Sequence, residues 1–330
     1  MSRQLSGPRK LTMREQLADL LTDREPDRYG EGGPVAVLES RVASLLGMEA
    51  ALFVPTGTMA QQIALRCWAE RSGNALVAMH PTAHPLLHEQ DALFVLAQLR
   101  AVRLARRPDV LITEADVGEC AQHFGTLLLE LPQREVGFLL PSWEELVAVV
   151  HAARKRGAML HLDGARLWES QFRLGKSLAQ IAGLFDSVYV SFYKALGGIS
   201  GAALAGSRDF IDQARVWRHR YGGMLFGQWP AALSALHGLN VELPRLGSYV
   251  EHAKVVAAAL GATEPHTHQF VLHVPHSPER LNAVRGDFLG KFVPSAVPGI
   301  AKTEVTVAAP ALEWTLEEIA DAYAEFIASV

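Results

Sequence analysis

Short, apolar, β-prone runs alternate with turns and amphipathic helical stretches along most of the chain up to residue 205. The predicted strands are 50–54, 75–79, 110–113, 126–130, 158–162, 188–192 and 202–205. Strands connected by helices in this way form an open, mainly parallel sheet with helices on its faces. The sequence therefore predicts an α/β fold.

A lysine, Lys194, lies just past the predicted strand 188–192, and small residues follow it up to Gly201. This pattern places an amine in a tight turn at the end of a strand, where the backbone can approach a ligand closely. A partly desolvated amine has a lowered pKa and can form a Schiff base. Taken alone, the stretch is also compatible with an ordinary solvated loop lysine.

A carboxylate, Asp163, ends the predicted strand 158–162 and is followed three residues later by Arg166. A carboxylate at the end of a buried parallel strand is costly unless a cation meets it. Arg166 could be that cation in a simple ion pair, or the carboxylate could hold a protonated ring nitrogen. The sequence alone leaves both interpretations open.

A small-residue turn, Thr56-Gly57-Thr58, joins the predicted strand 50–54 to a helix predicted over 60–71. Unpaired amides and the helix dipole make such a turn a site for an anion such as phosphate. The alternative is an ordinary strand-to-helix turn with a threonine N-cap. The turn has neither a Walker lysine nor a three-glycine fingerprint, so it is a weak signal by itself.

Three histidines, His80, His84 and His88, occur within nine residues. Their spacing would suit one face of a helix, but Pro81 and Pro85 argue against a regular helix there, and no further ligand cluster follows. We therefore expect no metal site. In a loop at the end of a strand, the ring of His84 is a candidate for stacking on a ligand.

The 330 residues are 49% apolar and 20% charged, enough for one large domain and one smaller domain. A net charge of −4 gives no electrostatic reason to expect nucleic acid or an anionic membrane as partner. Two distant cysteines, no apolar leader and no apolar run of membrane-spanning length suggest a reduced, cytoplasmic setting.

The expected domain organisation is an N-terminal arm (1–27), a large domain (28–245) and a small α+β domain (246–330). The predicted helices are 13–21, 34–46, 60–71, 143–156, 208–220, a long helical region from about 230 to 260, and 315–327. Strands are also predicted at 267–275 and 302–308.

The loops at the carboxyl ends of parallel strands meet at one edge of an open sheet, where ligands bind. That edge is predicted to hold Gly57, Thr58, His84, Asp163, Arg166 and Lys194. Together these are an anion cradle, a stacking ring, a carboxylate for a cationic nitrogen, a guanidinium and an amine. Pyridoxal phosphate chemistry needs this set: a lysine to link the cofactor and an aspartate to keep its ring nitrogen protonated.

The motifs resemble those of the threonine aldolases, in the β-eliminating lyase group of fold-type I pyridoxal-phosphate enzymes. The stretches that carry the resemblance are Tyr29-Gly-Glu31, Ala50 to Ala60, Thr82-Ala-His84, His161 to Leu167 and Asp186 to Gly198. The resemblance covers about residues 28–235 and is weaker beyond.

The resemblance implies a mainly parallel seven-stranded sheet in the large domain, a small C-terminal domain, and a homodimer or homotetramer. It implies that Lys194 forms the Schiff base, Asp163 bonds the pyridine nitrogen, and His84 stacks on the ring. It also implies that Gly57 and Thr58 bind the phosphate. Arg166, beside the phenolic oxygen and the substrate carboxylate, and Ser191, from the lysine motif, are further cofactor-binding candidates.

Several segments depart from the family pattern, and each bears on the substrate. The family's N-terminal Arg-Ser-Asp-Thr has no counterpart, and its Glu-Asn-Thr-His is replaced by Glu130-Leu-Pro-Gln-Arg134. The Gly-Gly-Gly-Met-Arg-Gln segment has become Gly222 to Gln228, without its arginine, and Lys302 stands near the expected carboxylate-binding arginine. The cofactor chemistry is therefore expected to be retained, with substrate recognition rebuilt.

The leading hypothesis is a lyase that cleaves the Cα–Cβ bond of a β-hydroxy-α-amino acid, giving glycine and an aldehyde. His84 or His88 is the candidate base for the β-hydroxyl. The alternative is another pyridoxal-phosphate reaction on a different amino acid, such as β-elimination, racemisation or a transaldolase-type condensation. A third interpretation is a cofactor-binding or interaction module without catalysis.

Overall fold

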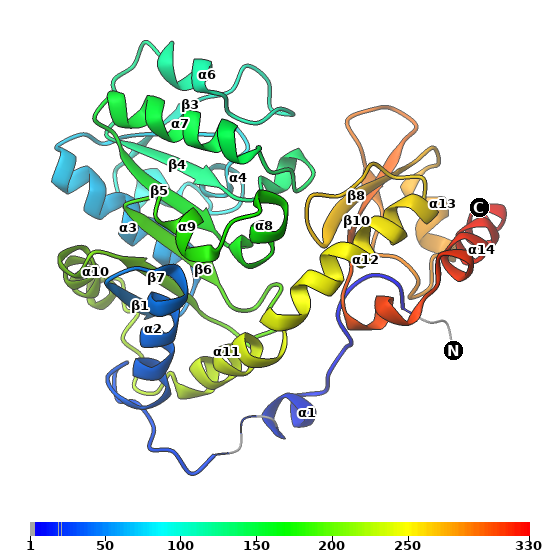
Figure 1. Cartoon of the computed structure of the whole chain (residues 1–330), viewed down its shortest axis with the longest axis horizontal. Coiled ribbons are helices and arrows are strands. Elements are labelled where there is room, and N and C mark those ends of the chain that lie inside the picture. The colour runs from blue at the N-terminus through cyan, green and yellow to red at the C-terminus, as the bar shows by residue number, and fades with distance from the viewer. Residues whose placement is uncertain (1–3, 19, 21) are drawn as a thin grey trace. The chain divides into compact units, whose positions relative to one another are not determined.

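A seven-stranded sheet forms the centre of the larger of two units in the computed structural model, which describes residues 4–18, 20 and 22–330 (Figure 1). The larger unit comprises the described residues of 13–136 and 140–243. The smaller comprises 4–12, 137–139 and 244–330. The division after residue 243 compares with the domain boundary expected after 245.

The larger unit alternates strands and helices in chain order. Its elements are α1 (Met13–Ala18), α2 (Gly33–Leu46), β1 (Ala50–Val54), α3 (Gly57–Ser72), β2 (Leu76–Met79), α4 (His84–Leu87), α5 (Ala92–Val95), β3 (Arg100–Arg103), α6 (Glu114–Gly118), β4 (Thr126–Glu130), η1 (Arg134–Val136), α7 (Trp143–Lys155), β5 (Met159–Gly164), α8 (Leu167–Leu174), α9 (Leu178–Ala182), β6 (Ser187–Ser191), β7 (Ala202–Gly206), α10 (Arg208–Arg220) and α11 (Trp229–Val241). The helix predicted over 13–21 is α1, and its expected end falls partly on residues 19 and 21, outside the described residues.

The strand order is β1-β7-β6-β5-β4-β2-β3. The pairs β6–β5, β5–β4, β4–β2 and β2–β3 are parallel, whereas β7 runs antiparallel to both of its neighbours. The predicted α/β class and the mainly parallel sheet are confirmed. Six strands of this sheet thus end at the same edge, which is where the candidate residues follow them.

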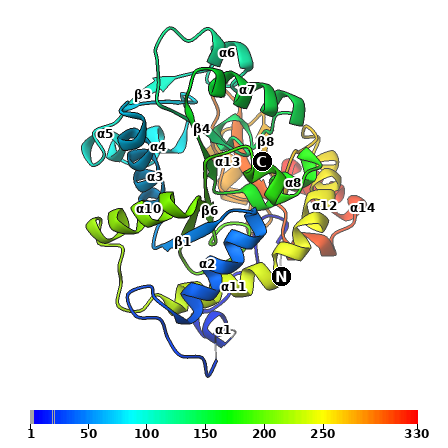
Figure 2. The same ribbon diagram turned by 60° about the vertical axis from the view of Figure 1, so that its left-hand side comes forward.

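Helices cover both faces of this sheet: α3 and α10 pack on one, and α2, α7 and α8 on the other (Figure 2). Side chains alternate between the faces along each strand. His161 and Asp163, two residues apart on β5, consequently point to the same face, and both reach Gln61 of α3. An apolar cluster that includes Ile63, Trp68 and Phe210 packs below that face.

The strand predicted at 110–113 is wrong; this segment contains no strand, and the outer strand is β3. β3 pairs with β2 alone, so it is an edge strand, and its terminal residues Arg100 and Arg103 are exposed. An edge strand does not need an apolar run, because half of its surface faces water. β3 therefore has no continuous apolar run from which it could be predicted.

Helix ends follow local signals. Ser142 and Glu145 form the predicted capping box of α7, and Gly47 in the left-handed conformation ends α2. The helical region expected from about 230 to 260 is confirmed, but it is not one continuous helix: α11 ends at Val241, and a 3₁₀ turn containing Pro244 separates it from the next helix, which ends at Ala259. Proline lacks an amide hydrogen and cannot continue a helix.

The smaller unit is an α+β arrangement built on an antiparallel sheet of order β8-β10-β9. Its elements are α12 (Leu246–Ala259), β8 (Gln269–Val274), α13 (Pro278–Val284), β9 (Val293–Pro294), β10 (Ala301–Thr306), η3 (Ala309–Glu313) and α14 (Leu316–Ala328). Residues 4–12, from the predicted N-terminal arm, belong to it: the amide of Gly7 donates to the carbonyl of Thr306 at 2.7 Å. None of the helices in the described residues is long and apolar enough to cross a membrane.

Candidate active site

A pocket of about 410 Å³, partly open to solvent, lies at the carboxyl edge of the large sheet. Its lining comes from β5 and β6, from the end of β4, and from the segments that follow β1, β2, β5 and β6. The lining residues are Thr56, Gly57, Thr58, Gln61, His84, Glu89, Glu130, Asp163, Ala165, Arg166, Tyr189, Tyr193 and Lys194. The predicted meeting of strand ends at one edge is therefore what the structure contains.

Six of the residues predicted for the site line this pocket: Gly57, Thr58, His84, Asp163, Arg166 and Lys194. Two do not. Ser191 is fully buried at the end of β6, and His88 lies on the outer side of His84, with the two ring centroids 5.2 Å apart. Lys302, the predicted carboxylate ligand, lies on β10 of the smaller unit, and its role stays a prediction.

The turn before α3 has the features of both interpretations considered for it. Thr56 is the N-cap, accepting a hydrogen bond from the amide of Met59 at 3.1 Å. The next two residues open the helix on the pocket wall, where first-turn amides have no acceptor within the helix. A Cβ on Gly57 would collide with the hydroxyl of Tyr189, so glycine is required for this close approach.

Asp163 is 2% exposed and is held by two donors. The side-chain amide of Gln61 donates to Oδ2 at 2.5 Å, and the backbone amide of Ala165 donates to Oδ1 at 3.1 Å. Burial raises the pKa of Asp163, and the nearby charge of Lys194 opposes that rise. A cationic nitrogen in the pocket would further favour the ionised carboxylate.

Lys194 lies in the loop after β6 and is mostly buried, with its ammonium group 5.8 Å from the ring centre of Tyr193. Burial and then repulsion from Arg166 lower the pKa of Lys194, while Asp163 and Glu130 counteract them. A lowered pKa increases the fraction of neutral amine, which is the nucleophilic form.

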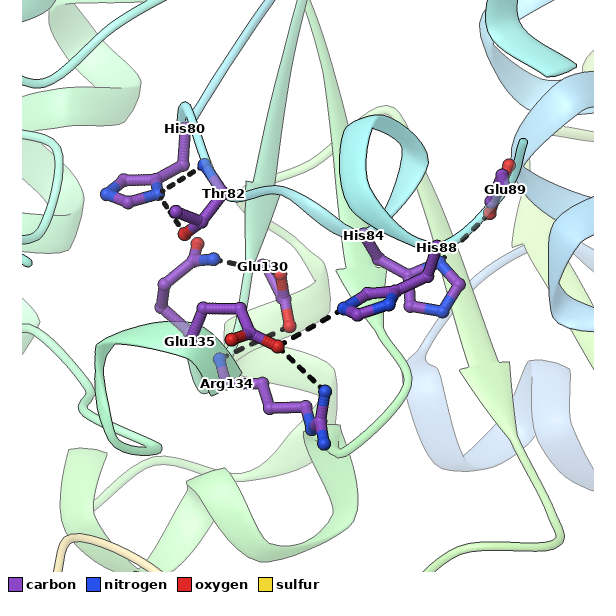
Figure 3. Close-up of polar contacts among 9 residues, drawn as sticks. His80, Thr82, His84, His88, Glu89, Glu130, Arg134 and Glu135 are labelled. Atoms are coloured by element: carbon purple, nitrogen blue, oxygen red, sulfur yellow. Dashed lines mark hydrogen bonds and ion pairs between the residues drawn. The ribbon is translucent and has the colours of Figure 1, made fainter. Parts of the chain in front are cut away.

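His84 is oriented by a buried carboxylate (Figure 3). Its Nδ1 lies 3.1 Å from Oε1 of Glu89, whose other oxygen accepts a hydrogen bond from the amide of Gln62 at 2.8 Å. The Glu89 side chain has no solvent exposure, against 34% for His84. The hydrogen bond to Glu89 is the main cause that raises the pKa of His84, and burial opposes it. The Nδ1 contact leaves the other ring nitrogen of His84 available for proton transfer.

His88 has a carboxylate partner of its own, Glu135, at 3.2 Å, and Arg134 donates to the same carboxylate oxygen at 2.7 Å (Figure 3). His80 is buried and holds the loop: its Nδ1 accepts from the amide of Thr82, and its Nε2 lies 2.8 Å from the carbonyl of Val110. Burial lowers the pKa of His80, so it stays neutral.

The predicted absence of a regular helix through these histidines is confirmed, because α4 contains only one turn. The described residues contain no cluster of three or more His, Cys, Asp or Glu side chains arranged to hold a metal ion.

Besides Glu89, a third carboxylate that the sequence motifs do not predict lines the pocket, Glu130. It accepts hydrogen bonds from the side-chain amide of Gln133 at 3.0 Å and from the backbone amide of Arg134 at 3.3 Å (Figure 3). Burial, and then the charge of Asp163, raise the pKa of Glu130 to about 7. Its position at the end of β4 is the same signal that identified Asp163, so it could have been found.

The pocket fits pyridoxal phosphate on its own chemistry. It combines a lysine whose pKa is lowered, a buried carboxylate that accepts one hydrogen bond on each oxygen from the described residues, and an imidazole held by a carboxylate. The N-terminus of α3 forms one wall of the pocket, and there a Cβ added to Gly57 would occupy the space beside the Tyr189 hydroxyl. These are the groups that hold a cationic ring nitrogen, an aromatic face and a phosphate.

The chain matches the family model described as β-eliminating lyase over residues 9–274. A low specificity L-threonine aldolase of Escherichia coli (strain K12) is 31% identical over 239 residues, which cover 71% of this chain and 71% of that protein. A putative aromatic amino acid β-eliminating lyase/threonine aldolase from Exiguobacterium sp. 255-15 is 36% identical, with a TM-score of 0.93, covering 100% of this chain and 97% of that chain.

A putative L-allo-threonine aldolase from Listeria monocytogenes EGD-E is 35% identical, with a TM-score of 0.88, and the similarity covers 98% of this chain and 94% of that chain. The family match spans most of this chain, and the predicted resemblance is confirmed. The chain belongs to the β-eliminating lyase family and is a pyridoxal-phosphate-dependent lyase.

Proposed function

We propose that this enzyme cleaves the Cα–Cβ bond of a β-hydroxy-α-amino acid, giving glycine and an aldehyde. The observation that carries the proposal is one pocket that combines Lys194, the buried Asp163 and a carboxylate-bound His84. The names of the similar proteins, threonine aldolase and L-allo-threonine aldolase, support the same reaction class.

In this proposal Lys194 would link the cofactor covalently and Asp163 would accept a hydrogen bond from its ring nitrogen. His84 would stack on the ring, the amides of Gly57 and Thr58 would bind the phosphate, and Arg166 would complete the set, whereas Ser191, buried at the end of β6 outside the pocket, would not touch the cofactor. When bound, the cofactor supplies an electron sink for the pair of electrons left at Cα when the bond breaks. Asp163 stabilises that sink because a buried carboxylate favours a protonated nitrogen beside it.

Two side chains have the proton chemistry that the reaction needs. His84 donates through Nδ1 to Glu89, so its Nε2 carries the lone pair that accepts the β-hydroxyl proton. Lys194, whose pKa is lowered, would accept and release a proton at its amine. His88, bound to Glu135 and in contact with His84, is the second candidate for the base.

The test is aldehyde release from L-threonine and L-allo-threonine by the purified protein, measured by coupling to an aldehyde-reducing enzyme. We expect release by the wild type and none by Lys194→Ala, which also loses the visible absorption of the bound cofactor. Cofactor absorption without aldehyde from any β-hydroxy-α-amino acid would contradict the proposed reaction.

A second candidate is a different pyridoxal-phosphate reaction, such as β-elimination, racemisation or a transaldolase-type condensation. The segment after β4 favours it. Gln133 and the backbone of Arg134 are bound to Glu130, and the Arg134 side chain is bound to Glu135, so this segment presents a different set of groups from the family pattern. Mass spectrometry of the products from a panel of amino acids distinguishes the two reactions.

We also propose that the chain forms a homodimer or homotetramer. The larger unit exposes large apolar side chains on α5 and in the loop before α11: Phe94, Val95 and Leu96 are 51–65% exposed, and Phe226 is 67% exposed. Contiguous exposed apolar surface marks an association site, and Phe94, Val95 and Leu96 are adjacent candidates for such a surface. Light scattering is expected to give a dimer or tetramer, with dissociation in Phe94→Glu or Phe226→Glu; a monomeric wild type would contradict this proposal.

A further inference from the structure

A continuous hydrogen-bonded network of buried side chains leads from Asp163 into the core of the larger unit. The Gln61 amide donates to Asp163 at 2.5 Å, and its carbonyl oxygen lies 2.9 Å from Nε2 of His161. Nδ1 of His161 lies 2.7 Å from the hydroxyl of Ser187, which in turn accepts from Nε1 of Trp68 at 2.7 Å. All five side chains are at most 4% exposed.

When Asp163 is ionised, only one arrangement of protons satisfies this network. A carboxylate accepts hydrogen bonds, so Gln61 must present its NH₂ group to Asp163 and its oxygen to His161. His161 must then carry its proton on Nε2. Its Nδ1 has a lone pair for the Ser187 hydroxyl, whose oxygen is left to accept from Trp68.

His161 is well suited to this fixed role. It is fully buried, and burial lowers its pKa to about 3, so the ring is neutral at any pH at which an enzyme of this class operates. A neutral ring with a fixed tautomer holds Gln61 in one orientation without adding charge next to Asp163. The network therefore fixes the orientation of Gln61 and does not conduct protons.

The position of Gln61 ties this network to the anion cradle. Gln61 lies on α3, one turn after Thr58, so one helix carries both the predicted phosphate site and the donor that fixes Asp163. His161 and Ser187 anchor the same helix to β5 and β6. The residues predicted to bind the phosphate and the ring nitrogen are thus both positioned by α3.

We propose that Gln61, His161, Ser187 and Trp68 are positioning residues that fix the rotamer of Asp163 and keep it a pure hydrogen-bond acceptor toward the cofactor's ring nitrogen. The proposal rests on the proposed cofactor role of Asp163. It predicts that removing a hydrogen bond of this network far from the pocket weakens cofactor binding, although the substituted side chain does not touch the cofactor.

The test compares two variants with a matched control. Gln61→Met keeps the volume of the side chain but removes its donor, and Trp68→Phe removes only the far end of the network while keeping a ring stacked on Phe210. Trp217→Phe is the control: the Trp217 indole also packs against the same apolar cluster, but it donates to Glu70, which is not part of the network.

The measurements are the dissociation constant of pyridoxal phosphate by equilibrium dialysis and the melting temperature of the cofactor-free protein. We expect binding about tenfold or more weaker in Gln61→Met, the loss of a hydrogen bond to a charged group. The loss of cofactor affinity in Trp68→Phe is expected to be smaller but measurable, and Trp217→Phe is expected to bind the cofactor as tightly as the wild type. Lower melting temperatures with unchanged dissociation constants in both variants would overturn the proposal, since the hydrogen-bonded network would then contribute to folding alone.

Nitrogen NMR of the cofactor-free protein tests the proton arrangement directly, with His161→Asn to assign the signal. We expect a neutral ring protonated on Nε2; a ring protonated on Nδ1 would overturn the inference. If the wild type binds the cofactor but releases no aldehyde, only the proposed reaction fails. If the wild type releases aldehyde and the variants bind normally, only the positioning role fails.

Discussion

At the scale of single residues, burial and specific partners act in opposite directions on the groups of the pocket. Burial raises the pKa values of Asp163 and Glu130 and lowers that of Lys194, because the charged form of each is poorly solvated. His84 is different: the hydrogen bond to Glu89 outweighs burial and raises its pKa. The partner, not the depth of the site, therefore sets the acid–base behaviour of His84.

The pH dependence of activity tests this assignment. His84 acts as a base only when neutral, that is, above its pKa, so the raised pKa places the acid limb of the kcat profile at a higher pH. Glu89→Gln removes the carboxylate, so we expect the acid limb to move to lower pH and kcat to fall, with His84→Ala losing about 100-fold or more.

The matched control for this experiment is Glu135→Gln, which removes the carboxylate partner of His88 instead. Its profile is expected to keep the acid limb of the wild type. A shift in Glu135→Gln with no shift in Glu89→Gln would identify His88, rather than His84, as the base.

Strand ends made several of these residues predictable, whereas their partners were not. Asp163 and Lys194 each follow a recognisable apolar strand, and parallel strands bring such positions together. Glu89 and Gln61 had no local signal: Gln61 meets a partner 102 residues away in sequence, and Glu89 meets Gln62 across 27 residues. Such contacts depend on tertiary packing, which no local pattern encodes.

At the scale of elements, the site depends on how closely α3 approaches the sheet. Gly57 begins α3 directly against Tyr189 of β6. Helices with caps and clear amphipathic patterns, such as α7, were predicted to within a residue or two, because their signals are local. The edge strand β3 and the break between α11 and α12 were missed, because solvent exposure and one proline, respectively, override the apolar pattern.

Gly57→Ala tests the importance of this close approach. The new methyl group would overlap the Tyr189 hydroxyl, so we expect a loss of about 1–3 kcal/mol of unfolding free energy together with weaker cofactor binding. Chemical denaturation of the cofactor-free protein measures the first effect. The double variant Gly57→Ala/Tyr189→Phe removes the overlapping oxygen and should recover part of the loss; no loss in the single variant would show that the turn tolerates a side chain.

At the scale of the whole molecule, the two units have different parts in this account. Every side chain that lines the pocket comes from the larger unit, where the family motifs are also concentrated. The segments that depart from the family pattern, including the one after β4 and Lys302 of the smaller unit, are those predicted to meet the substrate. Cofactor chemistry was therefore predictable from sequence, whereas the substrate's side chain was not.

Lys194 is the residue that is expected to hold pyridoxal phosphate in this pocket. Borohydride reduction of the cofactor-loaded protein, followed by peptide mass spectrometry, tests it most directly, because reduction converts the lysine–cofactor linkage into a stable amine. We predict the cofactor's mass on the peptide that contains Lys194 and on no other peptide. Trapping at a different lysine, or no trapped cofactor at all, would contradict this role of Lys194.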